Sequence, residues 1–183
     1  MQNNIIWEGI NDESVENCNV LTNEDGMEAN ATVSLLQDDY VCNIEYFVKI
    51  NRQWESRYLK IVNCHEEGNK ELELQRLPGN KWMVNGKEDA AYEGFDGIYI
   101  SVTPFTNTFI INRKKLQEEE SIKMRIIYIE PLEMRTEPIE VVYTKLTERE
   151  FEYQNLTTGY NVVLDVDENG LVTNYPGYFK MLG

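Results

Sequence analysis

The stretch that decides the fold class is Tyr40-Val41-Cys42-Asn43-Ile44-Glu45-Tyr46-Phe47-Val48-Lys49-Ile50. Its even-numbered positions are all apolar or aromatic, and its odd-numbered positions mostly are not. Successive side chains of a β-strand point to opposite faces, so this alternation predicts a strand with one buried face. A helix would instead place apolar residues at positions i, i+3 and i+4.

The same alternation recurs along the chain. It predicts further strands at residues 58–64, 71–77, 81–84, 97–103, 108–113, 122–129, 139–146, 151–154, 160–165 and 171–175. Turn-forming residues separate many of these segments, at 66–69, 85–86, 117–121 and 168–170. Short strands joined in this way predict an all-β, antiparallel fold. Helical pattern is scarce: residues 34–39 and 178–182 could each hold a turn or two, and the polar stretch 11–30 is expected to be a surface loop with a short strand, or a mobile arm.

Length and charge exclude several classes of protein. The chain has 183 residues, which predicts one domain spanning residues 1–183. Its net charge of −15 argues against nucleic-acid binding, because phosphate contacts need a surplus of Lys and Arg. The same charge argues against docking on an anionic membrane. A single His removes most His-dependent catalytic triads and His-rich metal sites.

Targeting signals and cysteines together predict a cytoplasmic protein. The first residues contain neither a basic segment nor a long apolar one, and no run of 18 apolar residues predicts membrane insertion. Cys18, Cys42 and Cys64 form an odd set without a CxxC spacing, which favours reduced thiols over a disulfide.

Two short motifs resemble functional sites but favour simpler interpretations. Residues 165–170 begin like a calcium-binding EF-hand loop, yet Pro176 stands where the loop needs Glu, and the flanks are strand-like. We therefore expect a hairpin with its positive φ values at Asn-Gly. Neighbouring Cys64 and His65 would point to opposite faces of a strand, so His65 is expected to be an exposed turn residue. The sequence predicts neither a metal site nor a cofactor.

Residues 96–113 carry a more informative pattern. A strand enters, Thr103 and Pro104 break it, residues 106–108 offer side chains that bond their own backbone, and a second strand is expected to leave. The structural interpretation is a tight corner in a sheet. The functional interpretation places Asp96, Thr103, Asn107 and Arg113 beside a cavity at that bend.

Residues 54–57 leave a similar choice open. Trp54 and Ser56 would share one face of a strand, and Glu55 and Arg57 the other. Either Trp54 is a core residue and Arg57 lies on the surface, or Arg57 points inward. An inward Arg57 would need a carboxylate partner, because an unpaired buried charge costs several kcal/mol.

These segments, together with the C-terminus, resemble a bacterial family of glycolipid-binding proteins. The resemblance runs over roughly residues 7–180. It is carried by Trp7, Glu16, Tyr46, Trp54, Arg57, Gly79, Trp82, Gly86, Asp96, Thr103-Pro104, Thr106-Asn107-Thr108, Arg113, Tyr153, Asp167, Gly170-Leu171-Val172 and Tyr175-Pro176-Gly177. The chain departs from the family pattern at residues 109–113, where one positive charge is missing, and at Phe95, where a Cys is common.

The resemblance implies an antiparallel spiral β-roll or half-barrel. It also brings scattered polar and aromatic residues together as a candidate ligand-binding set: Glu16, Trp54, Arg57, Trp82, Asp96, Thr103, Asn107 and Arg113. Tryptophans and several of the 11 Tyr would form apolar walls, while Arg57 and Arg113, balanced by Glu16 and Asp96, would hold a polar headgroup.

Three functional hypotheses follow. The leading one is a non-enzymatic module that binds a glycolipid or another amphipathic small molecule in a concave sheet. The alternative is a hydrolase or isomerase that uses Asp96 or Glu16 as a base with Arg113 as electrostatic stabiliser. A third is a purely structural polar network that closes the roll without any ligand. The oligomeric state is left open.

Overall fold

The computed structural model of the chain describes residues 2–11, 13–37, 40–64 and 68–182. The first half of the chain forms β1 (Gln2–Gly9), β2 (Ser14–Thr22), β3 (Gly26–Gln37), β4 (Tyr40–Asn51), β5 (Ser56–Cys64), β6 (Lys70–Leu77), β7 (Lys81–Val84) and β8 (Lys87–Glu88). A short 3-10 helix, η1 (Ala90–Tyr92), follows. The second half forms β9 (Gly97–Ile100), α1 (Phe105–Lys114), β10 (Ser121–Glu130), β11 (Arg135–Lys145), β12 (Glu150–Asn155), β13 (Tyr160–Val166), β14 (Val172–Tyr175) and β15 (Phe179–Leu182).

All of these strands belong to one sheet. Their spatial order is β8-β7-β6-β5-β4-β3-β2-β1-β15-β14-β13-β12-β11-β10-β9. Each half of the chain forms a meander, and the halves join where β1 pairs with β15. Neighbouring strands are antiparallel except for β9, which runs parallel to β10. The predicted all-β fold is confirmed.

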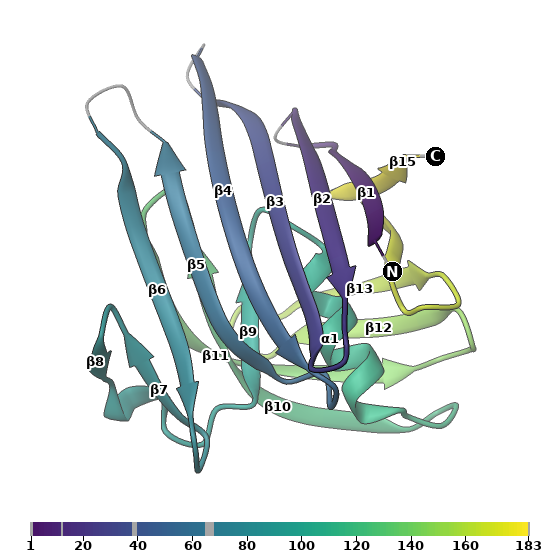
Figure 1. The fold of residues 1–183 in the computed structure, drawn as a ribbon. Coiled ribbons are helices and arrows are strands. Elements are labelled where there is room, and N and C mark those ends of the chain that lie inside the picture. Colours follow the sequence, from purple (N-terminus) through teal and green to yellow (C-terminus); the bar gives the residue numbers. More distant parts are fainter. Residues whose placement is uncertain (1, 12, 38–39, 65–67, 183) are drawn as a thin grey trace.

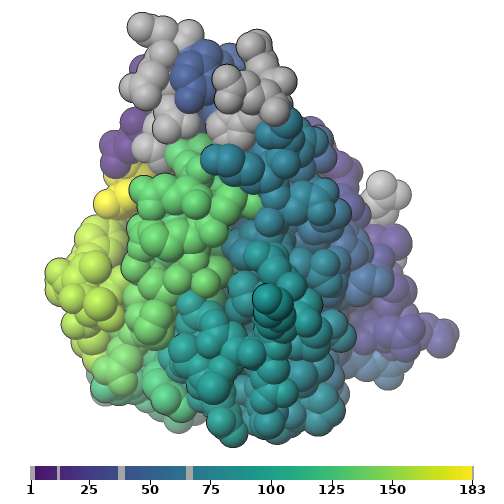
Figure 2. Space-filling view, turned by 90° about the vertical axis from the view of Figure 1, so that its left-hand side faces the viewer, coloured from purple at the N-terminus to yellow at the C-terminus, as the bar shows by residue number. Residues whose placement is uncertain are grey.

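The sheet curls because its two edges are consecutive in the chain. Residues 89–96 connect edge strand β8 to edge strand β9, and so short a segment spans at most about 30 Å. The upright strands β2 to β6 therefore stand against β10 to β13, which run across them (Figure 1). Gly94 N donates to Asn80 O at 2.8 Å, and Asp96 N donates to Arg125 O at 2.7 Å, so hydrogen bonds join this connection to both edge regions. Figure 2 shows this seam: residues near 75–100, in teal, lie directly against β10 and β11, in green.

Helix α1 lies inside the curled sheet (Figure 1). All residues from Phe105 to Ile111 are buried. Phe105 and Phe109 join a core cluster with β1 to β7, whereas Ile110 and Ile111 join a second cluster with β10 to β15. The helix thus fills the space between the two halves of the sheet.

The predicted strand at residues 108–113 is wrong, because these residues belong to α1. Because residues 105–111 are buried on every side, α1 lacks the one-sided apolar stripe by which a sequence pattern identifies a helix. The β-branched residues Thr106, Thr108, Ile110 and Ile111 add strand propensity. The preceding strand also ends earlier than expected, at Ile100.

Three further segments, near the two ends of the chain, are strands that the sequence pattern did not predict. Residues 11–30 hold all of β2 and the start of β3, rather than a surface loop with one short strand or a mobile arm. Residues 34–37 and 179–182 are strand rather than helical turns. The inward positions of β2 include Ser14 and Glu16 beside Cys18 and Val20, and all four are buried. Polar residues on the buried face removed the apolar alternation that would have marked this strand.

The predicted hairpin at residues 165–170 is confirmed. The Asp167 carboxylate accepts the N–H groups of Asn169 at 2.9 Å and Leu171 at 2.8 Å, so it stabilises its own turn. The prediction of positive φ at both residues of the Asn-Gly pair is wrong for Asn169, because only Gly170, with φ +73°, adopts it in this turn. The prediction for His65 lies outside the described residues. Among those that are described, no helix is long and apolar enough to cross a membrane.

Candidate functional site

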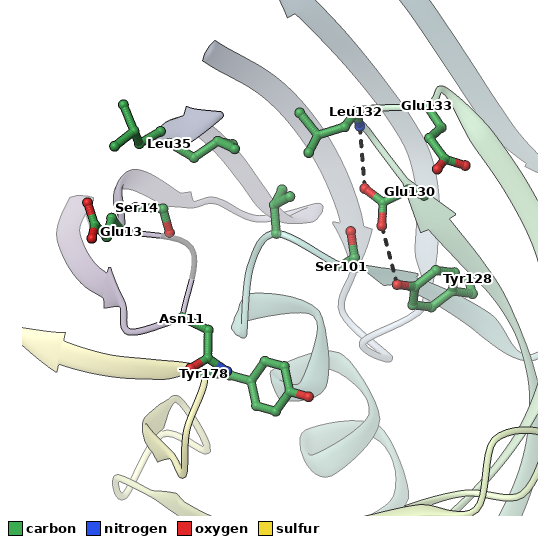
Figure 3. A pocket seen from close by; sticks show the side chains of 12 residues that line it. Asn11, Glu13, Ser14, Leu35, Ser101, Tyr128, Glu130, Leu132, Glu133 and Tyr178 are labelled. Carbon is green, nitrogen blue, oxygen red and sulfur yellow. Dashed lines mark hydrogen bonds between the residues drawn. The ribbon is translucent and has the colours of Figure 1, made fainter. Parts of the chain in front are cut away.

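A pocket of about 670 Å³ opens between the two halves of the sheet. It lies at the end of the roll where β2 begins and where β3 and β10 end, and we name it the mouth pocket (Figure 3). It is lined by Asn11, Glu13, Ser14, Leu35, Leu36, Ser101, Val102, Tyr128, Glu130, Leu132, Glu133 and Tyr178. Leucine and valine side chains thus share the wall with hydroxyl and carboxylate groups, which makes the pocket amphipathic.

A second pocket, of about 330 Å³, adjoins the first. We name it the tyrosine pocket; it shares Ser101, Tyr128 and Tyr178 with the mouth pocket and adds Tyr99, Arg135, Glu137, Ile139, Tyr153, Asn155, Thr157, Thr158, Tyr160, Tyr175 and Phe179. The ring of Tyr99 stacks on Tyr128 and on Tyr153, each at 5.8 Å between centroids. Burial raises the pKa of Tyr99 to about 12, so this phenol stays neutral at physiological pH. Stacked rings with hydroxyl tips offer both apolar area and hydrogen-bonding groups.

Glu16 lies one inward position beyond Ser14 on β2, and Ser14 lines the mouth pocket. It is 2% exposed, and the Tyr46 hydroxyl donates a hydrogen bond to its Oε1. The Tyr46 hydroxyl is also 3.4 Å from Thr103 Oγ1, directly after pocket residue Val102. Within the described part of the chain, Glu16 Oε2 has no hydrogen-bond partner.

The buried position controls the charge of Glu16. Burial raises its pKa to about 7, although the hydroxyls of Tyr46 and Thr103 favour the charged form and oppose that rise. Near neutral pH this carboxyl is therefore divided between its protonated and charged forms. Perturbed acids of this kind occur at functional sites and also in structural networks.

Asn107 holds α1 to the second half of the sheet. Its Nδ2 donates to Pro104 O at 3.0 Å, and its Oδ1 accepts a 2.6 Å hydrogen bond from the Tyr143 hydroxyl. Thr103 Oγ1 accepts the N–H of Phe105 at 3.1 Å, which satisfies one free donor at the start of the helix. The bend at residues 103–107 therefore begins a buried helix.

Three arginines gather at the opposite end of the roll, beside the seam. Glu55 Oε1 is 3.3 Å from Arg113 Nη2 and 3.9 Å from Arg76 Nη2, and Glu55 Oε2 is 3.6 Å from Arg57 Nη1. Arg113 and Arg76 both donate to the carbonyl oxygen of Asp96. We name these five residues the seam cluster.

A strained turn places Glu55 in this cluster. Asn51 Oδ1 accepts the N–H of Glu55 at 2.9 Å, and the intervening Trp54 adopts φ +60°, which is uncommon for a bulky residue. Burial pushes the pKa of the Glu55 carboxyl upward, but the Asn51 amide and the neighbouring guanidiniums outweigh burial and leave the pKa below its ordinary value. Glu55 is therefore charged and neutralises part of the arginine charge.

Other sequence candidates lie near the seam. The Trp82 indole donates to Phe95 O at 3.3 Å, and the Arg76 guanidinium stands 5.6 Å from the centre of the Trp82 ring. Trp54 is half-buried, and the side chain of Arg57 is 44% exposed, which agrees with the surface interpretation of that arginine.

The structure thus divides the candidate set rather than assembling one site. Glu16 and Thr103 lie beside the mouth pocket, Asn107 lies at the centre, and the remaining candidates lie at the seam or, for Trp54, in the turn that leads to it. Of the acids proposed as a catalytic base with Arg113, Glu16 lies apart from that arginine and contacts Tyr46. Asp96 lies beside Arg113 but meets it through the main-chain oxygen, while its carboxylate accepts the N–H of Arg125.

The side chains that line the two pockets were not singled out from the sequence. The abundance of tyrosine indicated aromatic walls, and inward positions such as Tyr153 fall on the alternating face of their strands. Which of these tyrosines meet depends on strand register and on the curl of the sheet, neither of which the sequence pattern specifies.

Comparison with known proteins agrees with this architecture. The sequence model of the family described as "Putative glycolipid-binding" matches residues 4–181. The fold is similar to the crystal structure of a DUF1089 family protein from Pseudomonas aeruginosa, with a TM-score of 0.82 and 27% sequence identity over 91% of this chain and 92% of that one. No curated protein matches the sequence. Because the family match spans nearly all described strands, the chain belongs to the family described as putative glycolipid-binding.

Proposed function

We propose that residues 1–183 form one binding unit that holds a glycolipid, or another amphipathic small molecule, in the mouth pocket and the tyrosine pocket. The observation that carries this proposal is that the two pockets adjoin and share Ser101, Tyr128 and Tyr178 in their walls. Pockets for small ligands are typically concave and largely apolar, with a few polar groups that fix orientation.

The two pockets suit different parts of such a ligand. Leu35, Leu36 and Val102 give the mouth pocket an apolar side that could cover the start of an acyl chain. The tyrosine pocket offers ring faces and hydroxyls to a sugar. The family assignment supports a glycolipid, and the three unpaired cysteines support the cytoplasm as the compartment.

Isothermal titration calorimetry with octyl β-D-glucoside tests this proposal. Tyr178 is suited to substitution because it lines both pockets and is 39% exposed. We expect Tyr178→Ala to weaken binding at least about fivefold, because the variant removes ring area from the ligand. Tyr58→Ala is the matched control, since Tyr58 packs on Phe47 and lines neither pocket. Absence of saturable binding, or equal effects of both variants, would refute the proposal.

The seam cluster supports a second, structural role for part of the candidate set. Arg76 and Arg113 bond the main chain of the segment that connects the two sheet edges. We propose that these arginines hold the roll closed. Loss of stability without loss of ligand affinity in Arg76→Met is the result expected from this role.

A further inference from the structure

The charge of the mouth pocket is one-sided. Glu13, Glu130 and Glu133 line it, and among the residues that the structure describes its lining contains no Lys, Arg or His. The adjoining tyrosine pocket adds Arg135 and Glu137. The two pockets together therefore carry a surplus of negative charge at the same place where their walls offer ring faces and apolar contact.

Arg135 is already engaged by two carboxylates. Its Nε lies 2.8 Å from Glu133 Oε2, and its Nη1 pairs with Glu137 Oε2. These side chains are substantially exposed, so the pairs are weak and screened by solvent. Arg135 therefore offsets the charge of only one of the four carboxylates that line the two pockets.

Glu130 is the carboxylate that stands out. It is half-buried at the end of β10, and its side chain lies between Leu132 and Tyr128 (Figure 3). Its Oε1 accepts the N–H of Leu132 at 3.4 Å, and its Oε2 accepts the Tyr128 hydroxyl at 3.4 Å. Both donors are uncharged, both bonds are long, and no ion pair to Glu130 exists among residues 2–11, 13–37, 40–64 and 68–182.

A carboxylate in this setting favours a cation. Partial removal from water weakens its hydration, and two long bonds to neutral donors replace that hydration only in part. A ligand ammonium would add up to three charge-assisted donors, and the adjacent tyrosine ring faces also attract cations. A phosphate, sulfate or carboxylate in the same place would meet like charge.

We propose that the two pockets select an amphiphile whose headgroup bears an amine, such as an amino sugar, and that this headgroup lies where the pockets meet at Tyr128, with Glu130 as the counter-ion. This inference rests on the proposed function, because it names the headgroup of a ligand bound in the same pockets. It also separates the headgroup site from the arginines of the seam cluster, which lie at the other end of the roll.

Three probes that share an octyl chain and a pyranose ring test this preference for an amine. Octyl β-D-glucoside is neutral, octyl 2-amino-2-deoxy-β-D-glucoside carries an amine, and octyl β-D-glucuronide carries a carboxylate. Titration at about pH 6 keeps the amine protonated and the glucuronide ionised. We expect the amine probe to bind at least about tenfold more tightly than the neutral probe and the glucuronide at least about tenfold more weakly.

Substitution of Glu130 tests whether the preference for the amine depends on this one side chain. Glu130→Gln should remove most of the preference for the amine and leave affinity for the neutral probe within about twofold. Glu71→Gln is the control, since it removes the same charge from an exposed pair with Lys60 on another part of the sheet. Glu71→Gln should keep the full preference.

The outcomes separate this inference from the proposed function. Saturable binding of the neutral probe with no gain for the amine, or a gain that survives Glu130→Gln, overturns the selection and leaves the proposed function in place. Binding of none of the three probes overturns both. If the glucuronide binds most tightly, the preference for an amine is also overturned, and the arginines of the seam cluster become the candidate headgroup site.

Discussion

Replacing Glu16 by Gln tests the charge state of this buried acid. Glutamine has nearly the same shape, and its amide oxygen can still accept the hydrogen bond from Tyr46. The substitution removes the ionisation and keeps the packing. At low pH, where Glu16 is protonated in the folded and the unfolded chain, the two proteins should have similar free energies of unfolding.

The size of the effect follows from the shift of the pKa. Burial raises the pKa of Glu16 from 4.5 to about 7, so the folded chain holds this proton more tightly than the unfolded chain. The free energy of unfolding of the wild type therefore falls as pH rises through this window. At about 1.4 kcal/mol per pH unit, the full loss is about 3 kcal/mol, and about 2 kcal/mol of it lies between pH 5.5 and 8.5.

Urea denaturation of both proteins across this pH range measures the difference directly. Subtraction of the two curves removes the pH dependence that arises from all other groups of this acidic chain. We expect Glu16→Gln to gain about 2 kcal/mol over the wild type between the two ends of the range, with equal m-values throughout. Glu71→Gln, an exposed control, should give a difference that does not vary with pH.

Two results would refute the reasoning. A difference that is constant from pH 5.5 to 8.5 would mean that Glu16 titrates near its ordinary pKa. A variant that loses stability relative to the wild type as pH rises would mean that the folded state stabilises the charged carboxylate.

Two further substitutions test the buried polar contacts. Tyr143→Phe leaves the oxygen of the fully buried Asn107 side chain without its 2.6 Å hydrogen bond and should lower the free energy of unfolding by about 2 kcal/mol at unchanged m-value. Arg76→Met should cost about 2 kcal/mol in urea denaturation, because the guanidinium is buried and bonds both Asp96 O and Asn80. Arg57→Met should cost less than about 0.5 kcal/mol, and equal costs for the two arginines would contradict the closing role of the seam cluster.

The local sequence pattern was sufficient to predict a strand wherever one face of that strand is apolar and the other is polar. The range 81–84 coincides with β7, and the start of the predicted strand at 40–50 coincides with that of β4. Turn chemistry was equally reliable at Asn85 and Gly86, both of which adopt positive φ. These features depend on neighbouring residues alone, so the sequence specifies them.

The apolar pattern of the sequence failed to predict elements whose buried surface is partly polar or is not confined to one face. Residues 105–111 of α1 are buried on every side, and the buried face of β2 carries Ser14 and Glu16, so neither segment shows the periodicity expected of its type. Burial of these residues follows from elements distant in sequence that cover them, and no local signal reports it.

The sequence alone determined the all-β class, most strands and the excess of acid. Tertiary structure decided how those acids are used: it places Glu130 in a pocket whose described lining has no basic side chain, buries Glu16 beside that pocket, and sets Glu55 among three arginines. The physical reason is that the charge state and role of a carboxyl group depend on burial and on partners brought together by the curl of the sheet.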